Sequence, residues 1–96
     1  MEQSTKRAMA RRPTLIPGCF VLSSHTFRDH RGSFVKVFQE SIFNELGLGI
    51  HYRESYFTRS HRNVVRGLHF QLPPHDHHKL VSCVTGEVLD VVVDLR

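Results

Sequence analysis

The sequence predicts an all-β protein, a barrel or a sandwich of short strands with one short helix. Three observations predict this class. Short apolar runs recur along the chain, turn residues separate them at regular spacing, and only one segment has helical periodicity. The chain has 96 residues, which suffices for one small domain whose core is marginal unless a partner covers part of it.

The first half of the chain is predicted to hold two strands and the helix. Short apolar or alternating runs, which are typical of strands, lie at residues 19–23 and 34–38. A turn cluster at residues 29–33 separates them. Residues 41–48 have the apolar stripe of a helix, and Ser41 is its candidate N-cap.

The second half is predicted to consist of strands alone. Runs rich in aromatic and β-branched residues lie at residues 52–58, 64–70, 80–84 and 87–95. Thr85-Gly86 is typical of a hairpin turn between the last two runs. An apolar strand such as the last one leaves an open edge unless another segment or a second copy covers it, so we expect the chain to associate.

Charge and hydropathy argue against some classes of protein. The formal net charge is +4, but the chain after Pro13 carries nine basic and eight acidic residues and offers no basic stripe for nucleic acid. No apolar run approaches the roughly 20 residues of a membrane-spanning helix. We expect residues 1–13 to form a disordered basic tail, residues 14–96 to form the folded domain, and the protein to be cytoplasmic, with neither nucleic acid nor membrane as a partner.

The residues of greatest chemical interest lie on the predicted strand 64–70 and just beyond it. Alternation places His69 and Gln71 on one face, beside a glycine that leaves room for a ligand. Arg66 lies on the other face, and Lys79 begins the next predicted strand. Histidine suits proton abstraction because its ordinary pKa of about 6.5 lies near working pH, and arginine suits phosphate because its planar fork donates two hydrogen bonds. These residue types together suit an anionic substrate that carries a carbonyl group.

The same residues lie in a series of separated motifs that resembles one known family. The series consists of Arg66-Gly67-Leu68-His69-Phe70-Gln71, a double proline, Lys79-Leu80-Val81, Gly86, Asp90-Val91-Val92-Val93-Asp94-Leu95-Arg96, and, upstream, Asp29-x-Arg31-Gly32-x-Phe34. Over residues 17–96 the chain resembles the N-terminal part of the dTDP-4-dehydrorhamnose 3,5-epimerases, which are nucleotide-sugar epimerases.

This resemblance implies a fold and a reaction. The fold is a cupin-type jelly-roll barrel, incomplete here at its C-terminus, in a homodimer. The reaction is epimerisation at C3 and/or C5 of a nucleotide-linked 4-keto-6-deoxy sugar of the dTDP-4-dehydro-6-deoxyglucose type, with neither a metal nor a cofactor. It serves the biosynthesis of dTDP-rhamnose or a related surface-polysaccharide sugar. A base removes a proton beside the 4-keto group, and an acid returns a proton to the opposite face.

The resemblance also implies roles for individual residues. His69 is the base, and Lys79 stabilises the enolate oxygen with its fixed positive charge. The implied substrate-binding residues are Arg31, Phe34, Glu54, Arg66 and Gln71. The arginines contact the diphosphate or the sugar, and Phe34 packs near the nucleotide. The family's tyrosine acid and the aspartate that orients the histidine are expected further along than these 96 residues. The chain departs from the family pattern at Lys36 and at Glu54-Ser55-Tyr56, so the sugar and the nucleotide base stay open, as does the number of inverted carbons.

Two alternatives to an active epimerase also stay open. One is a catalytically incomplete remnant that only binds the sugar nucleotide. The other is a metal-binding cupin, which depends on the run His75-Asp76-His77-His78, because cupins often bind metal through His-x-His. Such a site needs further ligands from other strands, and Lys79 beside the run would repel a cation. We therefore expect no metal site.

Overall fold

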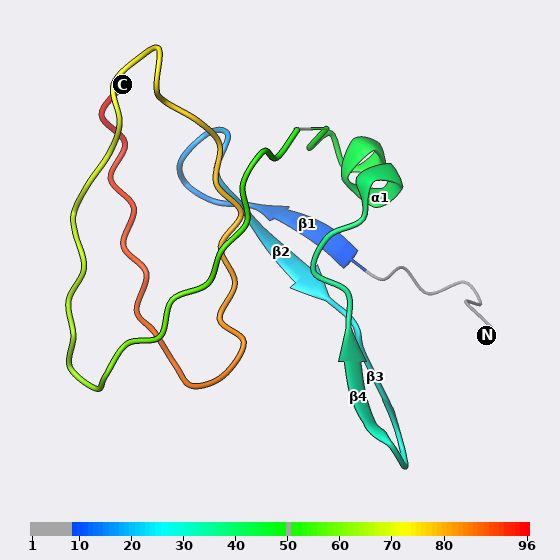
Figure 1. Cartoon of the computed structure of the whole chain (residues 1–96). Helices are drawn as coiled ribbons and strands as arrows, with labels where there is room; N and C mark the ends of the chain where they lie inside the picture. The colour runs from blue at the N-terminus through cyan, green and yellow to red at the C-terminus, as the bar shows by residue number, and fades with distance from the viewer. Residues whose placement is uncertain (1–8, 50) are drawn as a thin grey trace. The chain divides into compact units, whose positions relative to one another are not determined.

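The computed structural model describes residues 9–49 and 51–96. The described residues fall into two compact units, one formed by residues 9–49 with 82–96 and the other by residues 51–81. The regular elements all lie in the first unit (Figure 1): β1 (Met9–Pro13), β2 (Phe20–Ser24), β3 (Thr26–Asp29), β4 (Gly32–Val35) and α1 (Glu40–Glu45). Strands with one short helix are consistent with the all-β prediction. Within the described residues they form two antiparallel two-stranded sheets and no closed barrel.

The first sheet pairs β1 with β2. The register runs from Met9 opposite Ser24 to Pro13 opposite Phe20. The connecting loop is closed by Thr14, whose Oγ1 donates to the Cys19 carbonyl oxygen at 2.8 Å and accepts from the Ile16 N–H at 3.1 Å. The predicted strand at residues 19–23 is therefore confirmed, shifted by one residue.

Strand β1 corrects the prediction of a disordered tail. Residues 9–13 lie within the predicted tail, yet they pair along their whole length with β2. The guanidinium of Arg11 also lies 4.4 Å from the centre of the Phe20 ring, a cation–π contact that supports the pairing. The prediction is wrong for these five residues because an adjacent strand satisfies their backbone hydrogen bonds. The rest of the predicted tail, residues 1–8, lies outside the described residues.

The second sheet is the β3–β4 hairpin. Asp29 pairs with Gly32, so the hairpin turns at the predicted turn cluster. The side chain of Asp29 accepts the Arg31 backbone N–H at 2.8 Å, which is the local bond that makes aspartate favourable in turns. Strand β4 begins and ends earlier than the predicted strand at residues 34–38, because pairing with β3 sets its extent.

A helix is predicted at residues 41–48. The structure has helix α1 there, but it begins one residue earlier and ends at Glu45. Gln39 is its N-cap residue, so the prediction of Ser41 as N-cap is wrong; the Gln39 amide nitrogen instead donates to the Ser41 hydroxyl at 2.7 Å. Phe43 is the helix's buried residue, and its ring meets that of Phe38 edge to face at 4.7 Å. No helix in the described part of the chain is long and apolar enough to cross a membrane.

Replacing Phe43 by alanine is expected to destabilise the first unit by about 3 kcal/mol, because a fully buried aromatic ring would be lost and a cavity left. Phe43 and Met9, each 1% exposed, are the buried hydrophobic residues of the described chain. Thermal unfolding followed by circular dichroism measures the effect. Phe57→Ala is the control, because that side chain is 94% exposed; equal losses from both variants would contradict the assigned core.

The strands predicted in the second half are not formed. Between residues 51 and 96 the described chain has turns and irregular segments but no strand, and Figure 1 draws it as a trace without arrows. Strands need partners for their backbone groups, and no ladder partner faces these segments within the described residues. Many of their apolar side chains are exposed as a result, including Leu89 at 91%. The four strand predictions fail because β-propensity reflects how well side chains pack within a sheet, and a sheet requires neighbouring strands.

Candidate functional site

The residues that sequence and resemblance assign to the site divide between the two units. Arg31 and Phe34 belong to the first unit, on and beside the β3–β4 hairpin. The second unit carries the other five: Glu54, Arg66, His69, Gln71 and Lys79. Each group is therefore described by itself.

The imidazole of His69 packs over Gly67. A Cβ atom built on Gly67 would lie 3.1 Å from His69 Nδ1 and 3.4 Å from the His69 backbone nitrogen. Gly67 also has a φ of +110°, which favours glycine. The strand whose alternation predicts this proximity is not formed, and the space above Gly67 is used by the imidazole, whereas the sequence predicts room for a ligand. His69 is nevertheless exposed, so a solute can reach the ring.

Arg66 makes a side-chain hydrogen bond in the same unit. Its Nε donates to the Ser60 hydroxyl at 2.9 Å, across a separation of six residues. Ser60 was not a predicted site residue, and no motif in the sequence points to it. The guanidinium has five N–H donors, so this bond leaves capacity for an anion.

The remaining predicted residues of the second unit are exposed. They are Glu54, Gln71 and Lys79. Among the described residues, no hydrogen bond or ion pair joins His69 to any of them or to Arg66. Their assembly around one substrate therefore stays a prediction.

The histidine-rich run after the double proline forms a turn. The His75 backbone N–H donates to the Leu72 carbonyl oxygen at 2.8 Å. The Nδ1 of His77 lies 3.2 Å from the His75 carbonyl oxygen, which can only accept, so this nitrogen donates. In residues 9–49 and 51–96, no three histidine, cysteine, aspartate or glutamate side chains gather in a group that could hold a metal ion.

In the first unit, Arg31 is held by the aspartate of its own turn. Its Nη2 lies 2.7 Å from Asp29 Oδ2, and its Nε lies 3.2 Å from the same oxygen. This hydrogen bonding lowers the pKa of the Asp29 carboxyl and raises the pKa of Arg31. The side chain of Arg31 remains largely exposed, so an anionic ligand would reach a guanidinium whose orientation is already fixed.

This ion pair predicts a pH-dependent turn. The pKa of Asp29 in the folded hairpin lies below its ordinary value of 3.8, so the contact stabilises the turn above about pH 4 and is lost as the pH falls through the lowered pKa. We expect the Arg31 amide resonance to shift in that acidic range in an NMR titration. Asp29→Asn should abolish the shift, and Asp76→Asn should leave it intact. If the Arg31 amide resonance of the unaltered chain did not shift on acidification, the contact between Asp29 and Arg31 would be contradicted.

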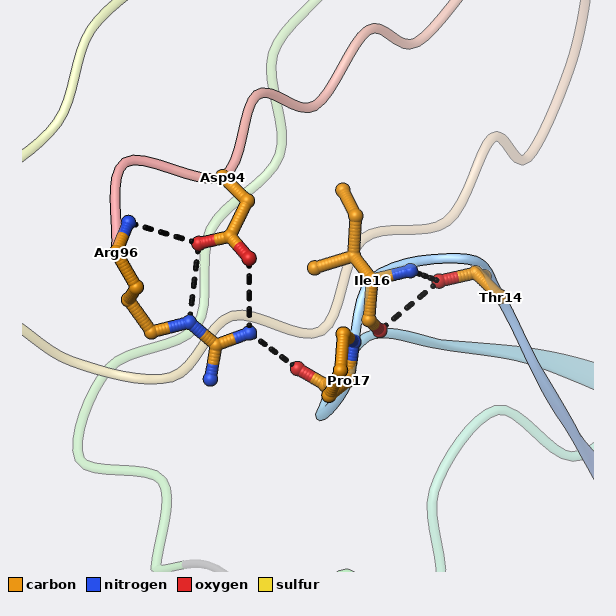
Figure 2. A network of polar contacts seen from close by, with 5 residues as sticks. All are labelled: Thr14, Ile16, Pro17, Asp94 and Arg96. Carbon is orange, nitrogen blue, oxygen red and sulfur yellow. Dashed lines mark hydrogen bonds and ion pairs between the residues drawn. The ribbon is translucent and has the colours of Figure 1, made fainter.

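A second polar network, in the same unit, fixes the end of the chain against the β1–β2 loop (Figure 2). The Nε of Arg96 donates to Asp94 Oδ1 at 3.0 Å, and its Nη2 donates to the Pro17 carbonyl oxygen. Hydrogen bonds from Arg96 lower the pKa of Asp94. A pocket of about 450 Å³ in the same unit is lined by Thr14, Leu15, Ile16, Cys19, Phe20, Val21, Asp90 and Val92. Residues of the motif Asp90–Arg96 therefore have structural contacts: Asp94 and Arg96 join the network with Pro17, and Asp90 and Val92 line the pocket.

Comparisons with known proteins identify the family of this chain. The family model described as dTDP-4-dehydrorhamnose 3,5-epimerase matches residues 13–96. The chain is 40% identical over 84 residues to the dTDP-4-dehydrorhamnose 3,5-epimerase of Shigella flexneri, an alignment that covers 86% of this chain and 46% of the relative. It is 40% identical over 83 residues to the protein of that name from Methanothermobacter thermautotrophicus, covering 86% and 44%.

A relative with a narrower name also matches. The chain is 38% identical over 89 residues to the dTDP-4-dehydrorhamnose 3-epimerase of Streptomyces niveus, covering 92% of this chain and 43% of the relative. No solved structure matches the chain significantly. The chain spans a little under half the length of these relatives. The range matched by the family model covers the positions of all the predicted site residues. The chain therefore belongs to the dTDP-4-dehydrorhamnose 3,5-epimerase family.

Proposed function

We propose that the protein epimerises a nucleotide-linked 4-keto-6-deoxy sugar of the dTDP-4-dehydro-6-deoxyglucose type, in the biosynthesis of dTDP-rhamnose or a related surface-polysaccharide sugar. The observation that carries this proposal is the family match over residues 13–96, within which His69 presents an accessible imidazole. The names of the relatives are compatible with two versions of the reaction. Most relatives are named 3,5-epimerases, and the Streptomyces niveus relative is named a 3-epimerase.

In the proposed reaction His69 is the base. The 4-keto group acidifies the protons on C3 and C5, and the neutral imidazole removes one of them. The packing of the ring over Gly67 supports this role, because a base must be held in a narrow range of orientations to be effective. Proton transfer to a positioned side chain contributes about 10²–10⁴-fold to a rate.

Lys79 is the proposed partner of the enolate. Removal of the proton places negative charge on the former keto oxygen, and a fixed ammonium there lowers the energy of that charge. A general acid then returns a proton to the opposite face of the carbon, which inverts it. Lys79 is exposed and therefore open to a ligand.

The other site residues are proposed to hold the substrate. Arg66 and Arg31 donate to the diphosphate or the sugar, and Phe34 packs near the nucleotide. Ser60 and Asp29 support this part of the proposal, because each fixes one guanidinium before a ligand arrives. Glu54 and Gln71 complete the set as hydrogen-bonding groups for the sugar.

We propose that residues 14–96 are the N-terminal part of a cupin-type jelly roll that functions as a homodimer. The apolar segment 87–95 supports this, because most of its side chains are exposed in the single chain, among them Val92 at 57%. Contiguous exposed apolar surface is typical of segments that pair with another strand or another subunit.

The test is to incubate the protein with dTDP-4-dehydro-6-deoxyglucose and separate the sugar epimers. Conversion to the C3 epimer or the C3,C5 epimer is the expected result, and recovery of unchanged substrate would overturn the proposal. The second candidate is a remnant that binds the nucleotide without turnover. It is favoured by one observation, that no carboxylate among the described residues hydrogen-bonds His69 to orient it. Binding of dTDP without conversion would establish that candidate.

A further inference from the structure

Ser60 lies where the chain folds back toward Arg66. The His61 carbonyl oxygen accepts the Val64 backbone N–H at 3.3 Å, which closes a turn directly after the serine. Asn63, within this turn, has a φ of +68°, a left-handed conformation that asparagine adopts more readily than most residues. The turn returns the chain so that the Nε of Arg66 donates to the Ser60 hydroxyl oxygen at 2.9 Å. The hydroxyl is therefore held beside a guanidinium.

The chain around Ser60 is basic and accessible. Between residues 55 and 75 it has no acidic residue, and its arginines there are Arg59, Arg62 and Arg66. The ion pairs of the described chain involve other arginines, so no described carboxylate pairs with these. Ser60 is exposed, and residues 51–60, which lead to it, form neither helix nor strand. An exposed irregular segment can enter the active site of a modifying enzyme, and a negative charge added there would meet uncompensated positive charge.

A phosphate on the Ser60 oxygen would bind Arg66 more strongly than the hydroxyl does. A phosphoserine carries a charge of about −1.5 to −2 at pH 7 and has three strong acceptor oxygens. The arginine fork can donate two parallel hydrogen bonds to such a group, whereas the neutral hydroxyl accepts one bond from Nε. The guanidinium would then be occupied by a group that is covalently fixed to the same unit. A free diphosphate would have to compete with that group.

We propose that Ser60 is a regulatory phosphorylation site, whose phosphate occupies the guanidinium of Arg66 and weakens the binding of a nucleoside diphosphate. A protein kinase would transfer the terminal phosphoryl group of a nucleoside triphosphate to the Ser60 oxygen. The phosphoanhydride bond breaks, a phosphate ester forms, and the nucleoside diphosphate and the hydroxyl proton leave. The loss of affinity rests on the proposed function, because it requires Arg66 to hold the diphosphate of the substrate.

The first test measures the contact between the phosphate and Arg66. The chain is produced with phosphoserine in place of Ser60, and its phosphorus NMR signal is followed over a pH titration. Because a guanidinium favours the doubly charged phosphate, we expect the second pKa of this phosphate to be roughly 0.5 lower than in the same chain with Arg66→Gln. Arg53→Gln removes the same charge from the same unit and should leave that pKa nearly unchanged. Equal pKa values with and without the Arg66 guanidinium would overturn the proposal.

The second test measures the consequence for binding. Titration calorimetry with dTDP is expected to show about tenfold weaker binding by the chain with phosphoserine at position 60 than by the unmodified chain. Phosphoserine in place of Ser82, an exposed serine of the other unit, adds the same charge and should leave the affinity unchanged. Ser60→Ala removes the hydroxyl without adding charge, and should weaken binding by less than about threefold.

The outcomes separate this inference from the proposed function. Equal affinities for the chains with phosphoserine at positions 60 and 82 would overturn the regulatory role. If dTDP does not bind the unmodified chain, the proposed function fails and the weakening of affinity fails with it, whereas the phosphorus titration still decides the contact with Arg66. Mass spectrometry of the protein isolated from its native cells is expected to find phosphate on Ser60, and a serine that is never modified there would overturn the site.

Discussion

Replacing His69 by alanine is expected to lower the rate of epimerisation by about 10³-fold, within the range that a positioned general base contributes. The methyl group of alanine cannot accept the proton from the carbon beside the ketone. Substrate affinity should change little, since the arginines proposed to hold the diphosphate remain. Initial rates of epimer formation over a range of substrate concentrations measure both effects, as a fall in kcat with little change in KM.

His77→Ala is the matched control for this prediction. It removes another exposed imidazole from the same unit, one whose contact is with the His75 carbonyl oxygen of a turn. The control should retain nearly the full rate. Equal rates for His69→Ala and the unaltered protein would show that another group takes the proton.

Replacing Gly67 by alanine is expected to lower the rate of epimerisation by roughly tenfold without removing any catalytic group. The new Cβ would lie 3.1 Å from His69 Nδ1, so the imidazole would have to move by a few tenths of an ångström, and the rate depends on how a catalytic group is oriented. The residue would also be strained at a φ of +110°. The rate of epimer formation measures the loss.

Gly86→Ala separates the contact from the backbone strain. Gly86 has a φ of +85°, and a Cβ built on it meets nothing within 4 Å. This control should lose stability but keep its activity when folded. If Gly67→Ala and Gly86→Ala lowered activity equally, the packing of the His69 imidazole over Gly67 would not contribute to catalysis.

The parts of the fold that the sequence predicts well are those determined by local contacts. The turn at residues 29–33 was predictable because Asp29 bonds to the backbone two residues on. The helix was predictable from its apolar stripe, but its start was not, because Gln39 has no typical N-cap side chain. The strands at 52–58 and 64–70 were overpredicted, since their residues suit a sheet whose other strands are absent from the described chain.

The candidate site shows the same division between local and distant contacts. The structure puts the imidazole of His69 directly over Gly67, although the strand whose alternation predicts that the two lie together is not formed. The bond from Arg66 to Ser60 and the bond from Arg96 to the Pro17 carbonyl oxygen were not predictable, because no sequence pattern links partners 79 residues apart in the second case.

The most direct test of the proposed reaction is the fate of two hydrogens when the protein is mixed with dTDP-4-dehydro-6-deoxyglucose in deuterated water. If an imidazole takes protons from carbons beside the ketone, the proton NMR signal of C3, of C5 or of both will disappear as solvent deuterium replaces the hydrogen. This loss should be faster by orders of magnitude than in the His69→Ala variant. Signals at C3 and C5 that persist with the unaltered protein as long as in buffer alone would contradict the account.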